Sequence, residues 1–451
     1  MGSYGDYLII FVVSAIGCYL FTFPATYLSR RMGSIAKPGD THIHDRATPV
    51  VGLGLLLGFL LAMGVSYFMP GLRPIFSASL QPLGVVLAGI VIYLVGLVDD
   101  IKDISPPAKI AGQVLSAMFL VYLGVTMFYF KLPFLPSIYT LSPSILPLIT
   151  ALWVVGMANA INIIDGLDGL AAGIVAIAAA ALAVYGFRLI YMGVLPGATN
   201  DLGPLVAVIA CGVAIGFLPH NFHPAKVFMG DSGAMFLGLL MAVATMIIGG
   251  RTGGTAAVDV SGLTFFRFAP LFIPFFILGV PMVDTLFAIL RRAIGRKGVA
   301  TRDLGHLHHR LVGLGHGHRR AVLILWAWTL VLSAFILYPV FEPEANAYVP
   351  IGVGVLCVVL YTLFRPGWGK NTVADAAITG INEGNDHQDK SSHEDKIVSG
   401  KSLWSDERTE DLQPGDILDI NTKRLEADPL SGNLSEETDY DLGIGLEAGN
   451  E

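Results

Sequence analysis

Four short polar clusters stand beside long apolar runs in this sequence, and their residue types could bind a metal ion and phosphate groups. They are residues 99–103, 159–169, 228–233 and 306–309. Carboxylate oxygens are the ligands that a hard cation such as Mg²⁺ prefers, and imidazoles among arginines suit phosphate oxygens. An isolated charge inside a bilayer costs roughly 3 kcal/mol on insertion scales. Several charges in such a setting therefore predict a site with chemistry to perform at a membrane surface.

The first cluster places three carboxylates, Asp99, Asp100 and Asp103, where an apolar segment ends. Carboxylates at the C-terminus of a helix repel one another and oppose the helix macrodipole. A hard cation or positively charged partner residues would relieve that repulsion. The alternative interpretation is a solvated helix end with no further role.

The second cluster repeats a polar side chain every three residues, which makes successive members neighbours on a helix. The series is Asn159, Asn162, Asp165 and Asp168. Gly166 and Gly169 allow close approach of backbone or ligand and predict the end of the helix. Two carboxylates with two carboxamides suit a site that holds a cation and reads a polar heterocycle by hydrogen bonds. The alternative is a set of polar residues that satisfy one another between helices.

The third cluster holds Asp231 between Gly230 and Gly233, at the start of another apolar segment. The N–H groups at a helix N-terminus can bind an anion or a metal-bound phosphate. A simple helix cap is the alternative role for Asp231.

The fourth cluster, His306, His308 and His309, lies in the longest basic loop, between Arg302 and Arg310. This cationic setting favours phosphate binding over the two alternatives, a transition-metal site and a solvated loop. Together the four clusters predict a diphosphate site with Mg²⁺ as cofactor. The sequence has no Walker-type Gly-x-x-x-x-Gly-Lys loop, which disfavours ordinary ATP-driven chemistry.

The elements that must position these clusters are transmembrane helices. Of 451 residues, 54% are hydrophobic and only 14% are charged, against about 25% charged in a soluble protein. Apolar runs of membrane-spanning length recur along the chain. The predicted fold class is an all-α polytopic bundle of about eleven transmembrane helices, with spans near 7–29, 48–69, 82–98, 110–128, 146–163, 170–190, 204–219, 234–249, 269–290, 321–340 and 348–364.

Charge divides the chain into two regions, residues 1–365 and 366–451. The second region holds 20 Asp and Glu against 7 Lys and Arg, and the first holds 15 against 21. The acidic composition of 366–451 predicts a disordered tail outside the catalytic domain. Basic residues concentrate in alternate loops, so the positive-inside rule places the N-terminus outside and the tail in the cytoplasm. The same orientation puts all four clusters on the cytoplasmic face.

Polar groups on a single face predict chemistry on a cytosolic substrate rather than transport, which needs polar groups at several depths. The competing hypothesis of a secondary transporter with an Asp/His relay would need paired repeats with Gly- or Pro-broken helices, and the sequence shows no such pair.

The same segments carry a family resemblance. Residues 99–103, 159–173, 220–233 and 306–310 match, in order and spacing, the polyprenyl-phosphate N-acetylhexosamine-1-phosphate transferases of glycosyltransferase family 4 type. The chain resembles these integral membrane enzymes over residues 5–365. The resemblance implies that a polyprenyl phosphate attacks the sugar-bearing phosphate of a UDP-N-acetylhexosamine, giving polyprenyl-diphospho-sugar and UMP with Mg²⁺.

The resemblance also implies roles for individual residues. Asp231 would be the main Mg²⁺ ligand, and Asp99 and Asp100 would position the metal and the lipid phosphate. Asn162 and Asp165 would line the catalytic centre. The remaining implied contacts are to the nucleotide: Asp168, Asn221 and Phe228 with uracil, and Arg302, His306, His308 and His309 with the phosphates.

Two features favour the branch that uses UDP-GlcNAc. The muramoyl-pentapeptide branch typically shows three adjacent histidines and a Lys or Asn where Asp103 stands, whereas this chain has His306-Leu307-His308-His309.

The expected partners are a UDP-N-acetylhexosamine, a polyprenyl (undecaprenyl or decaprenyl) phosphate and a bacterial plasma membrane. Nucleic acid is not expected as a partner, and a homodimer stays open.

Overall fold

The computed structural model describes residues 2–33, 35–36, 48–126, 129–130, 139–140, 142–193, 201–249, 318–341 and 348–364. Within them the elements are α1 (Tyr4–Met32), β1 (Ile35–Ala36), β2 (Thr48–Pro49), α2 (Leu53–Phe68), α3 (Arg73–Ala78), α4 (Gln81–Lys102), α5 (Pro106–Tyr122), β3 (Tyr129–Phe130), β4 (Tyr139–Thr140), α6 (Leu146–Ile164), α7 (Leu170–Tyr191), α8 (Leu202–Asn221), α9 (Gly230–Gly249), α13 (His318–Phe341) and α14 (Tyr348–Phe364). The strands form two short antiparallel pairs, with Ile35 opposite Pro49 and Tyr129 opposite Thr140.

The fold class is confirmed as an all-α multi-pass membrane protein. Ten of the eleven expected spans coincide with described helices, and seven of these are long and apolar enough to cross a bilayer. Span 269–290 and the tail 366–451 lie outside the described residues. The sequence analysis did not anticipate the short helix α3 or the two strand pairs, which join the longer helices.

Local sequence signals set the helix ends. Helix α1 starts with a reciprocal pair of hydrogen bonds, in which Asp6 N donates to Ser3 Oγ at 3.2 Å and Ser3 N donates to Asp6 Oδ2 at 2.7 Å. This arrangement is a capping box. A proline stands in the first turn of α4, α5 and α6, where it blocks no helical hydrogen bond.

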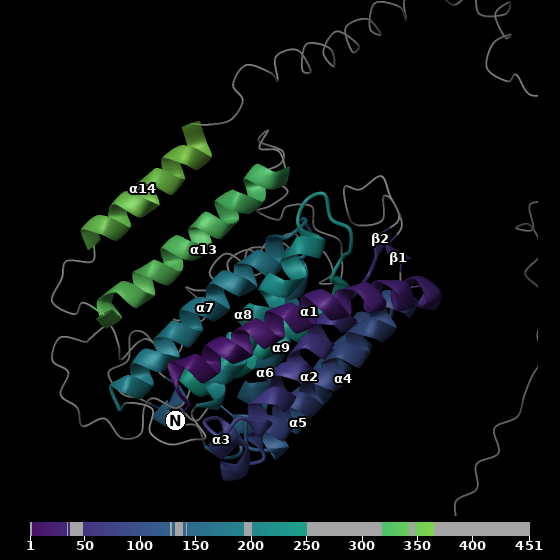
Figure 1. Cartoon of the computed structure of the whole chain (residues 1–451), viewed down its shortest axis with the longest axis horizontal. Helices are drawn as coiled ribbons and strands as arrows, with labels where there is room; N and C mark the ends of the chain where they lie inside the picture. Colours follow the sequence, from purple (N-terminus) through teal and green to yellow (C-terminus); the bar gives the residue numbers. More distant parts are fainter. Residues whose placement is uncertain are drawn as a thin grey trace, which may run out of the picture. The chain divides into compact units, whose positions relative to one another are not determined.

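Helix α9 lies at the centre of the helix packing. It contacts α4, α6, α7 and α8, and 94% of its apolar stretch is buried inside the bundle. Helix α1 packs on α2 and α8, and α13 packs on α7, as Figure 1 shows. Helix α9 is therefore shielded by its neighbours along most of its length.

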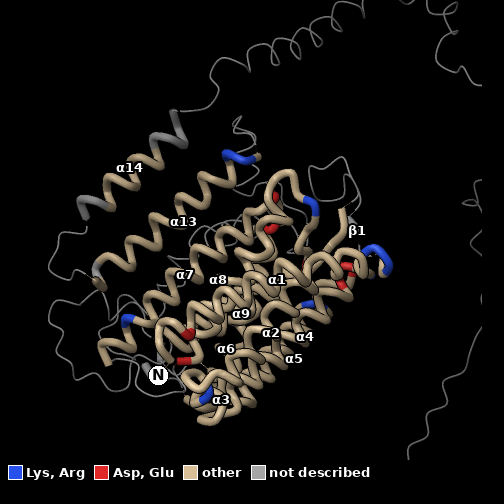
Figure 2. The backbone as a smooth tube through the Cα atoms, viewed as in Figure 1, with Lys and Arg blue, Asp and Glu red and all other residues tan. Residues whose placement is uncertain are grey.

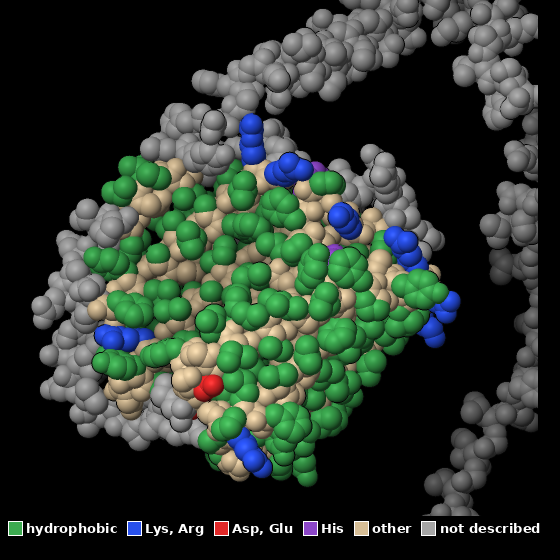
Figure 3. Space-filling view, in the orientation of Figure 1, with side chains coloured by type: hydrophobic (Ala, Val, Ile, Leu, Met, Phe, Trp, Pro, Cys, Tyr) green, Lys and Arg blue, Asp and Glu red, His purple; other side chains and the backbone are tan. Residues whose placement is uncertain are grey.

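The exterior is apolar, as a lipid-facing surface must be. Exposed side chains on α1 include Leu8, Ile16, Leu20 and Phe23, each at least 54% exposed, and Figure 3 shows hydrophobic side chains over most of the face in view. Figure 2 shows the described charged residues close to helix ends. The polar groups of the site therefore belong to helix ends rather than to the apolar middle of the bundle.

Candidate active site

Three helix ends bring two carboxylates and a lysine together. Lys109, in the first turn of α5, bonds to Asp99 in the last turns of α4, with Nζ 2.8 Å from Oδ2. The same ammonium group bonds to Asp231 in the first turn of α9. A backbone N–H from Ile104 also donates to Asp99 Oδ1 at 2.9 Å. We call this arrangement the Asp99–Lys109–Asp231 junction.

Asp100 performs a different task from its neighbour. Its two carboxylate oxygens accept hydrogen bonds from the backbone N–H groups of Asp231 at 2.8 Å and Ser232 at 3.1 Å. These N–H groups have no partner within α9, because a helix leaves its first N–H groups unpaired. Asp100 therefore caps α9 from another helix. The Asp231 side chain is left to bond to Lys109, so the simple cap considered for Asp231 is not its role.

Gly230 makes the close approach of Asp100 to α9 feasible. Its φ of +63° lies in the left-handed region, where other residues are strained. A Cβ at this position would overlap Val50 and lie 2.7 Å from Asp100 Oδ1. On the other side, Phe228 N donates to Pro49 O at 3.0 Å and Val51 N donates to Phe228 O at 2.7 Å. The segment before α9 is therefore fixed between α4 and the start of α2.

The loop between α6 and α7 is tied to the loop between α8 and α9. Asn221 Oδ1 accepts from Gly169 N and its Nδ2 donates to Val227 O, both at 3.0 Å. Asp168 Oδ2 lies 2.8 Å from His223 Nδ1 and accepts from Ala225 N at 3.1 Å. Asp168 and Asn221 are both buried. Their observed role is to hold the two loops together, and a contact of either residue with uracil stays a prediction.

The members of the second cluster differ in their surroundings. Asn159 pairs with Gln113 of α5, donating from Nδ2 to Oε1 at 2.7 Å, which is the interhelical role considered above for this series. Asn162 is partly exposed, and Phe228 is buried. Arg302, His306, His308 and His309 lie outside the described residues.

Asp165 lies where negative charge accumulates. Burial raises the pKa of its carboxyl group well above the ordinary value, and the charges of Asp231, Asp100 and Asp168 raise it further. Repulsion of this kind is what a divalent cation relieves. In the described part of the chain, no three His, Cys, Asp or Glu side chains are grouped so that they could hold a metal ion. Lys109 supplies the positive charge between Asp99 and Asp231.

The donor set nevertheless suits Mg²⁺. Asp99 and Asp231 present carboxylate oxygens on either side of the Lys109 ammonium group. Mg²⁺ usually binds one or two carboxylates together with substrate phosphates. Asp99, Asp231 and Asp165 are the residues whose charges an ion at the junction would neutralise.

Lys109 is the candidate site residue that the sequence analysis did not single out. A usable signal was present. A lysine in the first turn of a helix opposes the macrodipole, as do carboxylates in a last turn. Two neighbouring helix ends with unfavourable charges of opposite sign predict an ion pair between them.

Lys109→Gln is expected to lower turnover roughly ten- to a hundredfold, because the variant loses a charge-assisted contact to two carboxylates. Lys102→Gln is the matched control, since Lys102 is exposed at the end of α4. Steady-state rates of the two purified variants check the prediction. Equal effects from both changes would show that general surface charge, rather than the junction, matters.

Comparison with known proteins decides the family. A family model described as glycosyl transferase family 4 matches residues 82–249, a stretch that includes Asp99, Lys109, Asp165 and Asp231. A decaprenyl-phosphate N-acetylglucosaminephosphotransferase of Mycobacterium tuberculosis is 35% identical over 368 residues, which are 79% of this chain and 89% of the relative. The chain belongs to glycosyl transferase family 4. The resemblance to polyprenyl-phosphate N-acetylhexosamine-1-phosphate transferases is thereby confirmed.

Other family members support the same assignment with different printed substrates. A probable undecaprenyl-phosphate N-acetylglucosaminyl 1-phosphate transferase of Bacillus subtilis is 32% identical and covers 72% of this chain and 83% of its own. A phospho-N-acetylmuramoyl-pentapeptide-transferase of Heliobacterium modesticaldum is 33% identical and covers 72% and 94%. Identity to these two relatives is similar, so residue-level features must distinguish the sugar within the family.

Proposed function

We propose that this protein transfers N-acetylglucosamine 1-phosphate from UDP-GlcNAc to a polyprenyl phosphate at the cytoplasmic membrane face. The products are polyprenyl-diphospho-GlcNAc and UMP, and the reaction would begin a lipid-linked glycan of the cell envelope. The observation that carries the proposal is the Asp99–Lys109–Asp231 junction at helix ends inside the stretch that matches the family model. N-acetylglucosamine in the names of the Mycobacterium and Bacillus relatives supports this sugar.

The reaction is a phosphoryl transfer. A non-bridging oxygen of the lipid phosphate forms a bond to the sugar-bearing phosphorus, and the bond from that phosphorus to the bridging oxygen breaks. UMP leaves with the bridging oxygen and its electron pair. Such reactions depend mainly on positioning and charge neutralisation. Lys109 provides one positive charge at the junction, and any proton on the attacking phosphate would pass to Asp99 or Asp100.

Asp231 and Asp99 would hold Mg²⁺, which would supply positive charge against the diphosphate oxygens. Asp100 would act largely through α9, since both of its oxygens already accept backbone N–H groups. Asn162 and Asp165 would line the centre, and Asp168, Asn221 and Phe228 would shape the uracil site. Arg302, His306, His308 and His309 would bind the nucleotide-sugar phosphates.

A substrate panel tests the proposed function. Purified protein in lipid nanodiscs with polyprenyl phosphate and Mg²⁺ is expected to release UMP from UDP-GlcNAc and not from UDP-MurNAc-pentapeptide. His308→Ala or His309→Ala should lower the rate roughly ten- to a hundredfold through loss of a charge-assisted phosphate contact. The similarity to the Heliobacterium relative makes the pentapeptide substrate the competing candidate. Equal or better use of that substrate would reject the sugar assignment while leaving the family intact.

The orientation has its own test. We propose that the site and the tail face the cytoplasm, because basic residues concentrate in the loops on the side of the site. In a background without Cys18, Cys211 and Cys357, an impermeant thiol reagent applied to intact cells should label Thr255→Cys and miss Ser402→Cys. Labelling of Ser402→Cys from outside would contradict the orientation.

A further inference from the structure

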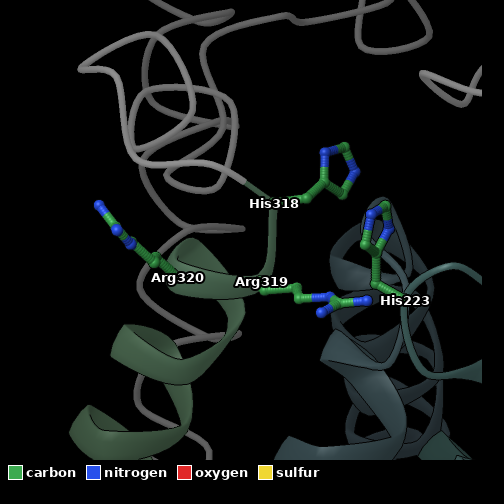
Figure 4. A pocket seen from close by; sticks show the side chains of 4 residues that line it. All are labelled: His223, His318, Arg319 and Arg320. Carbon is green, nitrogen blue, oxygen red and sulfur yellow. The ribbon is translucent and has the colours of Figure 1, made fainter. Parts of the chain in front are cut away.

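A cationic pocket lies between the start of α13 and the loop that joins α8 to α9. It is an open pocket of about 400 Å³, lined by His223, His318, Arg319 and Arg320. Figure 4 shows the two imidazole rings close together, with the Arg319 side chain extending toward His223 and the Arg320 side chain pointing away. The sequence analysis and the proposed mechanism assign no role to these four residues.

The two histidines are held in a defined arrangement. Their rings stack with centroids 5.1 Å apart and planes 22° from parallel. Asp168, which is buried, contacts His223 at Nδ1 over 2.8 Å. A protonated imidazole donates from both nitrogens, so His223 can donate from Nδ1 to Asp168 and from Nε2 to a second acceptor.

The pocket carries net positive charge. Arg319 and Arg320 are exposed and permanently charged, and together they exceed the single negative charge of Asp168 even when both imidazoles are neutral. An anion in the pocket would attract both guanidinium groups and offset the repulsion between their like charges. Guanidinium and imidazolium groups form charge-assisted hydrogen bonds with phosphate oxygens. The pocket chemistry therefore fits a phosphate group.

Helix packing fixes the pocket in place. Trp326 of α13 donates from Nε1 to Leu170 O at 3.4 Å, and its ring centroid lies 5.9 Å from that of Phe222. The indole lies so close to Gly173 of α7 that a Cβ there would overlap it. Helix α13 is therefore positioned against the same two loops that Asp168 and Asn221 join.

We propose that His223, His318 and Arg319 form a subsite for a phosphate group of the uridine nucleotide. The inference rests on the proposed function, because UMP is the nucleotide which that reaction releases. The two arginines are exposed and adjoin the α8–α9 loop, whose Lys226 is also exposed. A water-soluble phosphate thus reaches the pocket more directly than the phosphate of a lipid. The phosphate of the polyprenyl lipid is the other phosphate group that could occupy the pocket. The experiment below distinguishes the nucleotide phosphate from the lipid phosphate.

The test compares binding of UMP and uridine to the full chain in nanodiscs by titration calorimetry. His318→Gln and Arg319→Gln are each expected to raise the Kd for UMP at least about tenfold, with the Kd for uridine unchanged. Arg30→Gln is the matched control, because it removes the same charge at an exposed arginine of α1 that does not line the pocket. Its effect on the Kd for UMP should be less than about twofold.

Two results would overturn the subsite. Equal losses from Arg319→Gln and Arg30→Gln would indicate diffuse electrostatics. An unchanged Kd for UMP in both His318→Gln and Arg319→Gln would remove the nucleotide phosphate from the pocket. If that result came with a raised KM for polyprenyl phosphate, the pocket would belong to the lipid. If the wild-type chain bound UMP but did not release UMP from any UDP-sugar, the proposed function would be wrong. The binding test of the phosphate subsite would still be valid.

Discussion

Replacement of Asp231 by asparagine is expected to lower UMP release at least about a hundredfold at every Mg²⁺ concentration. An amide is isosteric with the carboxylate and can still accept a hydrogen bond from Lys109, so the packing of α9 should survive. The amide has no negative charge and is a far poorer ligand for a hard cation. Loss of one preorganised electrostatic contact in an active site typically costs 10²- to 10³-fold in rate. A Mg²⁺ titration of the variant measures the effect.

The matched control for this change is Asp45→Asn, which removes an acidic charge from a part of the sequence outside the four polar clusters. The control should keep nearly full activity. Normal Mg²⁺-dependent turnover by Asp231→Asn would remove Asp231 from the metal site, whereas equal losses in both variants would indicate a general need for acidic charge at this face.

Gly230→Ala is expected to abolish activity and to lower the melting temperature. Alanine at a left-handed position costs about 1–2 kcal/mol, and its Cβ would overlap Val50 and press on Asp100 Oδ1. Relief of that overlap moves Asp100 away from the N–H groups of Asp231 and Ser232. Buried N–H groups without a partner cost about 1–3 kcal/mol each. Thermal unfolding and UMP release, measured on the same preparation, test both parts of the expectation.

Gly64→Ala provides the comparison for Gly230→Ala. Gly64 lies inside α2, and a Cβ there would have no atom within 4 Å. Alanine in a helix interior is favoured over glycine by roughly 0.5–1 kcal/mol, so this variant should be as stable as the wild type or slightly more stable. An active and stable Gly230→Ala variant would show that the approach of Asp100 to α9 is not required.

The helices were predictable because the signal for each is local. An apolar run of about 20 residues is sufficient to span a bilayer whatever it packs against, and the runs at 82–98 and 170–190 became α4 and α7 with ends shifted by few residues. Short strand pairs and α3 carry no such signal. Their place depends on how the ends of longer helices meet.

The site was predictable by residue type but not by partner. Asp99 and Asp231 were expected to act together, and the structure joins them through Lys109, whose contact with Asp231 spans 122 residues of sequence. No local pattern encodes a contact of that range. Asp168 and Asn221 show the other side of the difficulty. The sequence does not show whether a buried carboxylate or amide binds a ligand or, as here, the backbone of another loop.

The cap that Asp100 places on α9 has a consequence for the order in which the protein is assembled. Asp99 meets Lys109 only ten residues later in synthesis, so α4 and α5 can enter the membrane as a hairpin whose charges at that turn partly cancel. Asp100 meets Ser232 only after 132 residues, which corresponds to roughly 7–26 s of translation at 5–20 residues per second. During that interval the first hairpin is complete while the catalytic end of the molecule is not. The insertion of α9 is then the event that completes the Asp99–Lys109–Asp231 junction.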